Sequence, residues 1–147
     1  MPTIRVVRSI AAPLELVFTT VADITQFRQA IPHIVNVEFL SATRSGVGTR
    51  FRETRLMNGK EMPTELEVTE YVKNDRIRLV ADSHGTIWDT LFTVRSDQGR
   101  TELTMVMEAK GYKLLAKIMN LLICRLVAKA VEQDMDSVKT FCENRPK

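Results

Sequence analysis

The spacing of hydrophobic residues changes twice along this chain, and each change marks a different kind of element. Residues 3–10 alternate between apolar and polar side chains and are rich in Ile and Val, which predicts a strand. Apolar residues then recur at helical spacing over residues 14–21, directly after a proline that suits the first turn of a helix. Residues 24–31 predict a second short helix, which the proline that follows brings to an end.

From residue 34 onward the apolar residues recur at every second position, which predicts strands separated by turns. Turn signals rich in Gly, Asn, Asp and Ser fall at residues 45–48, 58–59, 73–75, 83–85 and 97–99. They divide this part of the chain into six predicted strands. Asn58-Gly59 is the strongest signal, because a two-residue type I′ turn needs a positive φ at both positions.

These turns predict how the strands pair. With Asn58-Gly59 as a loop, Arg52 faces Glu65 on one side of the sheet and Phe51 faces Leu66 on the other. A turn at residues 84–85 predicts the pairs Ala81–Trp88 and Ile77–Phe92, and a four-residue loop at residues 96–99 predicts Phe92–Leu103 and Thr90–Met105. One apolar inner face results, with Phe51, Leu66, Val68, Ile77, Leu79, Trp88, Phe92, Leu103, Met105 and Met107.

The last predicted element is a long helix over residues 112–143. Its second half carries an apolar stripe at helical spacing, whereas residues 114–126 are apolar around more of the circumference. Such a helix needs the inner face of the sheet for its stability. The predicted fold is therefore α+β, with one domain spanning residues 1–147. A seven-stranded antiparallel sheet wraps around the long C-terminal helix, and two short helices lie between strands one and two.

The composition argues against two kinds of binding partner, nucleic acid and a membrane that the chain would cross. A net charge of +3 and an aromatic content of 6% argue against nucleic acid. The most apolar run, residues 118–124, is far shorter than the ~20 residues of a membrane span, and the start lacks the layout of a signal peptide. We therefore expect a cytoplasmic protein.

Cys124 and Cys142 lie too far apart on one helix for a disulfide, and two histidines besides them offer no metal site. No cofactor is expected.

Several short segments carry a resemblance to a known family. They are residues 10–13, 17–18, 21–23, 48–54, 59–62, 101 and 103–104, followed by the long C-terminal helix. Together they resemble the START-like (SRPBCC, helix-grip) superfamily and, within it, the polyketide cyclase/dehydrase and lipid-transport group. The resemblance covers essentially the whole chain. It implies a protein that binds lipids, sterols, quinones, polyketides or hormones, and it specifies the fold better than any reaction.

Two charged residues stand out on the predicted inner face. Glu53 and Arg55 share the parity of Phe51 and lie side by side. A buried charge needs a partner, so one interpretation is a mutual ion pair, with Arg55 partly solvated. The other is a polar anchor for a carboxylate, phenol or carbonyl of an apolar ligand. The candidate ligand-binding residues are Phe51, Glu53, Arg55, Leu66, Trp88, Thr90, Phe92, Met105, Met107, Met119 and Leu122.

Three hypotheses about function follow. The leading one is a protein that binds a small, largely hydrophobic molecule, such as a lipid, polyketide or quinone, between the sheet and the last helix. The second is a cyclase- or dehydratase-type enzyme with Glu53 as acid or base, although Arg55 would lower the pKa of that carboxyl. The third is a protein-interaction module. For Leu121 and Ile123, in the broad apolar half of the last helix, three interpretations stay open: burial against the two short helices, a homodimer face or a cavity lid.

Overall fold

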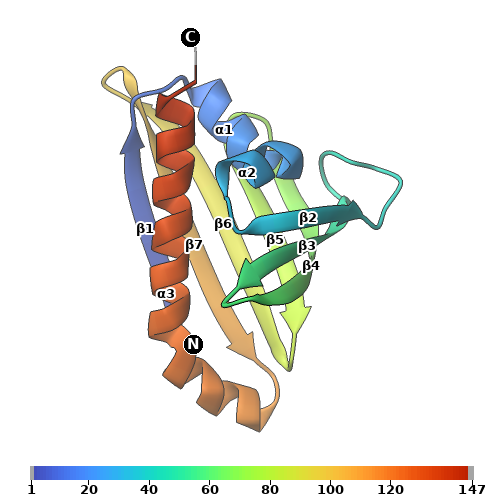
Figure 1. The fold of residues 1–147 in the computed structure, drawn as a ribbon. Coiled ribbons are helices and arrows are strands. Elements are labelled where there is room, and N and C mark those ends of the chain that lie inside the picture. Colours follow the sequence, from blue (N-terminus) through green and yellow to red (C-terminus); the bar gives the residue numbers. More distant parts are fainter. Residues whose placement is uncertain (1, 146–147) are drawn as a thin grey trace.

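The computed structural model describes residues 2–145 of the chain (Figure 1). The strands are β1 (Thr3–Ile10), β2 (Ile34–Phe39), β3 (Arg50–Met57), β4 (Lys60–Val72), β5 (Arg76–Ser83), β6 (Thr86–Asp97) and β7 (Arg100–Gly111). The helices are α1 (Leu14–Ala22), α2 (Ile24–Ala30) and α3 (Leu114–Glu143). The order and type of these elements confirm the α+β fold expected from the hydrophobic pattern and the helix-grip arrangement that the resemblance implied.

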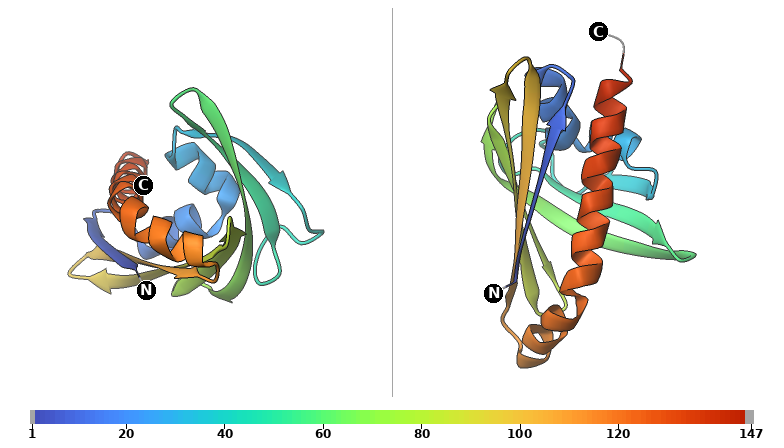
Figure 2. Two further views of the ribbon diagram at one scale, coloured as in Figure 1. Left: turned by 90° about the horizontal axis from the view of Figure 1, so that it is seen from below. Right: turned by 90° about the vertical axis from the view of Figure 1, so that its left-hand side faces the viewer.

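All seven strands belong to one antiparallel sheet with the order β1-β7-β6-β5-β4-β3-β2. Two strands from the start of the chain, β1 and β2, therefore form opposite edges of the sheet. Seen from below, the sheet curls around the helices, and α3 runs along the side where the sheet does not close (Figure 2). The concave face of the sheet is consequently the one that faces all three helices.

The register between β3 and β4 is the predicted one. Asn58 and Gly59 both have positive φ, at 52° and 78°, as a type I′ turn requires. Arg52 accordingly pairs with Glu65, and Phe51 pairs with Leu66. Between β5 and β6, the predicted pairs Ala81–Trp88 and Ile77–Phe92 are also confirmed.

The predicted register between β6 and β7 was wrong by two residues. Phe92 pairs with Met105 rather than Leu103, and Thr90 pairs with Met107 rather than Met105. The loop is shorter than the sequence suggested, because Gln98 and Gly99 alone form the turn, with φ of 50° and 79°. A shift of two residues leaves each side chain on the same side of the sheet, so the composition of the inner face is unchanged.

The core lies between the concave face and the helices. Strand residues such as Ile77 and Leu103 are fully buried there together with Phe18 of α1. The second half of α3 adds a buried stripe, which is Val131, Met135, Val138 and Cys142. Cys142 and Cys124, both on α3, are free thiols, as their predicted separation along one helix required.

Candidate functional site

The main polar feature of the concave face joins strand β3 to helix α3. Arg55 Nε donates a hydrogen bond to Glu53 Oε2 at 2.9 Å. Its Nη1 donates to both carboxylate oxygens of Asp134, at 2.8 Å and 3.1 Å. We call Glu53, Arg55 and Asp134 the anchor triad. It connects the β3–β4 hairpin to α3 across the open side of the curled sheet.

Sequence reasoning found two members of the triad and missed the third. Glu53 and Arg55 form the ion pair that their shared parity suggested. Asp134 is separated from Arg55 by 79 positions in the chain, so no local rule pairs them. A signal was nevertheless present: Asp134 lies three residues after Val131 and four before Val138, and a charge within an apolar stripe needs a partner.

The triad holds one cation between two anions in a largely buried setting. Burial alone lowers the pKa of Arg55, but Glu53 and Asp134 outweigh it, so the pKa is raised and Arg55 stays charged. Burial raises the pKa of Asp134, and the attraction of Arg55 and His33 offsets this only in part. Asp134 therefore holds its proton to higher pH than an ordinary aspartate does.

One nitrogen of Arg55 has no protein partner. Its Nη2 makes no hydrogen bond to any described residue, whereas Nε and Nη1 are both engaged. No buried side-chain nitrogen or oxygen atom among the described residues lacks a partner. It follows that Nη2 is open to solvent, consistent with a side chain that is 23% exposed. The guanidinium is thus fixed by two carboxylates and keeps two N–H groups for another acceptor.

Most of the other candidate residues on the sheet lie on the concave face as predicted. Phe51, Glu53, Thr90, Phe92 and Met105 are buried, and Leu66 is half-buried against the core. The Phe92 ring packs edge-on against Phe27 of α2, with ring centres 6.4 Å apart. Phe51, Phe92 and Met105 belong to the buried apolar core, against which Leu66 packs.

Trp88 and Met107 meet at a small cavity at the other end of the concave face. The cavity has a volume of about 10 Å³ and is lined by Pro2, Ile4, Trp88, Met107, Ala109, Asn120 and Cys124. This volume accommodates about one water molecule. At its edge, Asn120 Nδ2 of α3 donates a buried hydrogen bond to Thr86 Oγ1 at 3.1 Å. That bond fixes the first half of α3 to the start of β6.

Met119 and Leu122 lie in a different setting from the other candidates. Both belong to the first half of α3, and Leu122 is 70% exposed. The structure therefore does not bring them into the buried concave face. A wider open groove of about 390 Å³ lies elsewhere, lined by Ala30, Pro32, Asp136, Ser137, Thr140 and Phe141. The candidate residues do not line it.

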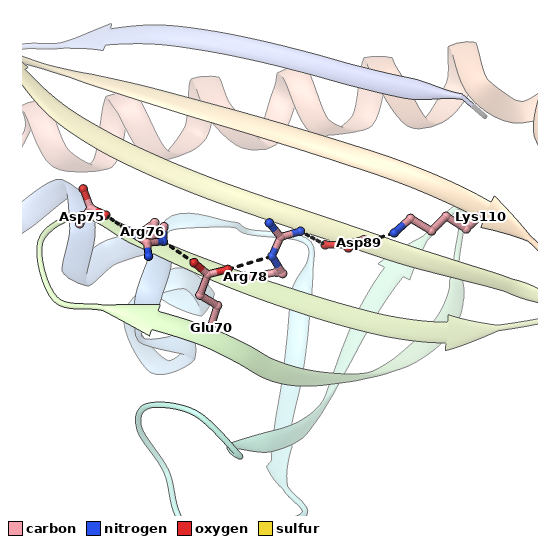
Figure 3. Close-up of polar contacts among 6 residues, drawn as sticks. All are labelled: Glu70, Asp75, Arg76, Arg78, Asp89 and Lys110. Carbon is pink, nitrogen blue, oxygen red and sulfur yellow. Dashed lines mark hydrogen bonds and ion pairs between the residues drawn. The ribbon is translucent and has the colours of Figure 1, made fainter.

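The convex face of the sheet provides a contrast to the anchor triad. A chain of alternating charges crosses it, which we call the outer ladder: Asp75, Arg76, Glu70, Arg78, Asp89 and Lys110 (Figure 3). Hydrogen bonds from Arg76 and Arg78 lower the pKa of Glu70. Asp89 lies on this face opposite Val80 and so does not reach the concave face.

The residues that the structure describes hold no group of three or more His, Cys, Asp or Glu side chains arranged to bind a metal ion. Within the same residues, none of the helices is long and apolar enough to cross a membrane.

Comparisons with known proteins place the chain in a family. The profile of the family described as "Polyketide cyclase / dehydrase and lipid transport" matches residues 1–143. The chain therefore belongs to this family, whose members share the START-like fold seen here. No protein with a curated description matches the chain in sequence.

Solved structures with the same fold have distant sequences. A START superfamily protein from Mycobacterium smegmatis superposes with a TM-score of 0.77 at 14% identity, covering 96% of this chain and 97% of that one. The protein TTHA0849 from Thermus thermophilus gives a TM-score of 0.71 at 20% identity, covering 97% and 94%. The di-domain ARO/CYC protein StfQ from the steffimycin biosynthetic pathway gives 0.81 at 11% identity, covering 98% of this chain and 52% of StfQ. These likenesses show the fold.

Proposed function

We propose that this protein binds a small, largely hydrophobic molecule between the concave face of the sheet and α3, with Arg55 as its polar anchor. The open Nη2 of Arg55 is the observation that carries the proposal. A guanidinium held by two carboxylates is already oriented, so it loses little freedom when it binds a ligand oxygen. The apolar side chains around it provide the contact area for the rest of the molecule.

The charges of the triad favour one class of polar group on the ligand. Two carboxylates around a single guanidinium leave a net negative charge when all three are ionised, and a third carboxylate would be repelled. A neutral acceptor such as a ketone, quinone or phenol oxygen meets the two free N–H groups without that repulsion. We therefore favour a polyketide- or quinone-like ligand over a fatty acid.

Binding a molecule of this size requires space that the first half of α3 controls. A cavity of about 10 Å³ beside Trp88 is too small for such a ligand. The segment that covers this end of the concave face is the one fixed by the Asn120–Thr86 hydrogen bond. We infer that the first half of α3 moves outward when the ligand enters.

Native mass spectrometry of freshly purified protein, followed by solvent extraction, identifies a ligand that is carried through purification.

Titration with a hydroxynaphthoquinone and with palmitate compares the affinities of a ligand with neutral oxygens and a ligand with a carboxylate. The fluorescence of Trp88, the one tryptophan of the chain, reports binding. We expect tighter binding of the quinone. Arg55→Lys should weaken it about tenfold, since lysine cannot keep the planar geometry of the guanidinium, whereas Arg52→Lys on the convex face should change nothing. Equal binding by both variants contradicts the proposed anchor.

The reactivity of Cys124 gives a second measurement of the same site. Cys124 lines the cavity beside Trp88 and is half-buried, while Cys142 is buried and its pKa is raised by burial. We expect iodoacetamide to modify Cys124 first in the free protein. A bound quinone should slow that modification, and if it leaves the rate unchanged, the ligand does not occupy this end of the concave face.

Asp134 supports a second candidate function, an enzyme of the cyclase or dehydratase type. Because burial raises its pKa, Asp134 is better suited than an ordinary aspartate to donate a proton to a carbonyl oxygen held by Arg55. The acid in this hypothesis is Asp134 in place of Glu53. Turnover of a reactive poly-β-ketone by the wild type, but not by Asp134→Asn with its ligand affinity retained, would support it.

A further inference from the structure

The first half of α3 turns its apolar side chains away from the protein. Its large exposed residues are Leu114, Leu115, Ile118, Met119, Leu121, Leu122 and Leu126, and Leu121 is 73% exposed. The residues that this segment buries are small or polar, namely Ala116 and Asn120. A surface helix of a globular protein normally does the opposite, with its apolar side toward the core. An outward apolar surface of this kind marks a contact with something outside the chain.

The charges of the same segment all have one sign. No acidic residue occurs between Glu108 and Glu132, whereas the same stretch contains Lys and Arg residues. Lys113, Lys117, Arg125 and Lys129 form no ion pair with any described residue. Lys110 differs, because it pairs with Asp89 and Glu108. The exposed leucines are thus accompanied by cations whose charge nothing on the protein neutralises.

The combination of unpaired cations and exposed apolar side chains distinguishes between two possible partners of this surface, a second copy of the chain and a lipid bilayer. A second copy of the chain in a twofold contact would bring these cations against the same cations, with no acidic side chain from the segment to pair with them. A bilayer with anionic lipids offers hydrocarbon to the leucines and phosphate groups to the cations at the same time. We propose that the first half of α3 docks the protein on an anionic membrane surface, lying in the interface without crossing it.

The order of residues along the helix fits this orientation. Leu114, Ile118, Leu121 and Leu122 follow one another on the outward side, and Arg125 lies on the same side one turn further on. Lys113 and Lys117 lie at the start of the segment. With the leucines inserted below the phosphates, the long lysine and arginine side chains extend back to the headgroups. These leucines are already exposed without a ligand, and an outward movement of the segment would leave them on its outer side, so docking does not require a ligand in the concave face.

Co-sedimentation with lipid vesicles tests the proposal on the whole protein. The probes are vesicles of phosphatidylcholine alone and vesicles that also contain phosphatidylglycerol. We expect binding to the anionic vesicles that weakens with salt, and little binding to the neutral ones. Leu121→Gln should weaken binding about tenfold, since a buried leucine side chain contributes about that much in transfer from water. Lys117→Gln should weaken it about fivefold, the effect of one lysine at an anionic surface.

Matched controls come from exposed residues elsewhere in the chain. Val47→Gln changes an exposed apolar side chain in the loop before β3, and Lys73→Gln changes a cation in the turn before β5. Both should bind vesicles like the wild type. Because all four positions are exposed, thermal unfolding should show the variants equally folded.

Three results would overturn the proposal. The first is no binding to anionic vesicles. The second is binding that Leu121→Gln and Lys117→Gln leave unchanged, which would place the contact elsewhere. The third is a stable dimer in light scattering that Leu121→Gln converts to a monomer, which assigns the surface to a second copy. Loss of quinone binding with Arg55→Lys would leave vesicle binding intact, so the two proposals fail separately.

Discussion

The two halves of α3 belong to one continuous helix, yet they relate to the rest of the molecule in opposite ways. The second half buries Val131, Met135 and Val138 in the core and contributes Asp134 to the anchor triad. The first half buries Ala116 and Asn120 and leaves its leucines in solvent. The stability of the fold therefore depends on the second half. The first half is available for a contact outside the core, because its larger side chains are not needed within it.

The largest expected difference between the halves concerns two methionines. Met135 is 1% exposed, and Met119, in the first half, is 45% exposed. Met135→Ala should lower the free energy of unfolding by about 3 kcal/mol, through lost burial and a new cavity. Met119→Ala should lower it by about 0.5 kcal/mol or less. Urea unfolding measures both, and equal losses would show that the first half of α3 also supports the core.

A second comparison concerns two arginines that each contact two carboxylates. Arg55 lies within the anchor triad, whereas Arg52 contacts Glu38 and Glu65 on the convex face. Arg55→Ala leaves Glu53 and Asp134 in a largely buried site without their cation, and should cost about 3 kcal/mol of stability. Arg52→Ala should have a much smaller effect, since solvent screens its partners. Similar losses in urea unfolding would mean that the triad is solvated when no ligand is bound.

The smallest effect is a difference in pH dependence between Asp134 and Glu70 of the outer ladder. The pKa of Asp134 is raised above its ordinary 3.8, so the folded state binds more protons there than the unfolded state. Its contribution to stability is therefore present at low pH and lost as the pH rises through the raised pKa. The pKa of Glu70 is lowered, so its contribution has the opposite sign: present above its ordinary value and lost as the pH falls.

Asp134→Asn and Glu70→Gln each remove one titrating carboxyl group. The difference in unfolding free energy between the wild type and each variant therefore reports the pH dependence of that carboxyl group. From about pH 4 to about pH 7, the stability of the wild type should fall relative to Asp134→Asn and rise relative to Glu70→Gln. Urea unfolding at each pH gives the differences. A rise relative to both variants would show that Arg55 stabilises the ionised form of Asp134 more than burial destabilises it.

The sequence by itself determined the features that depend on neighbouring residues. Asn58-Gly59 set the β3–β4 register because few conformations other than a type I′ turn accommodate those residues between two strands. Alternation assigned Phe51, Glu53 and Arg55 to the concave face, since a strand leaves no other side for them. The one register error, between β6 and β7, came from a choice between a two-residue and a four-residue loop. That choice moves each pair by two positions without changing the side of the sheet.

The tertiary structure alone decided which distant groups meet. Asp134 reaches Arg55 because α3 lies along the open side of the curled sheet, and the path of a helix across a sheet depends on packing throughout the core. The same packing decided that Met119 and Leu122 remain exposed while Met135 is buried, although the helical pattern treats all three as apolar. Local spacing determines which side of an element a residue occupies, and only the assembled core determines what that side contacts.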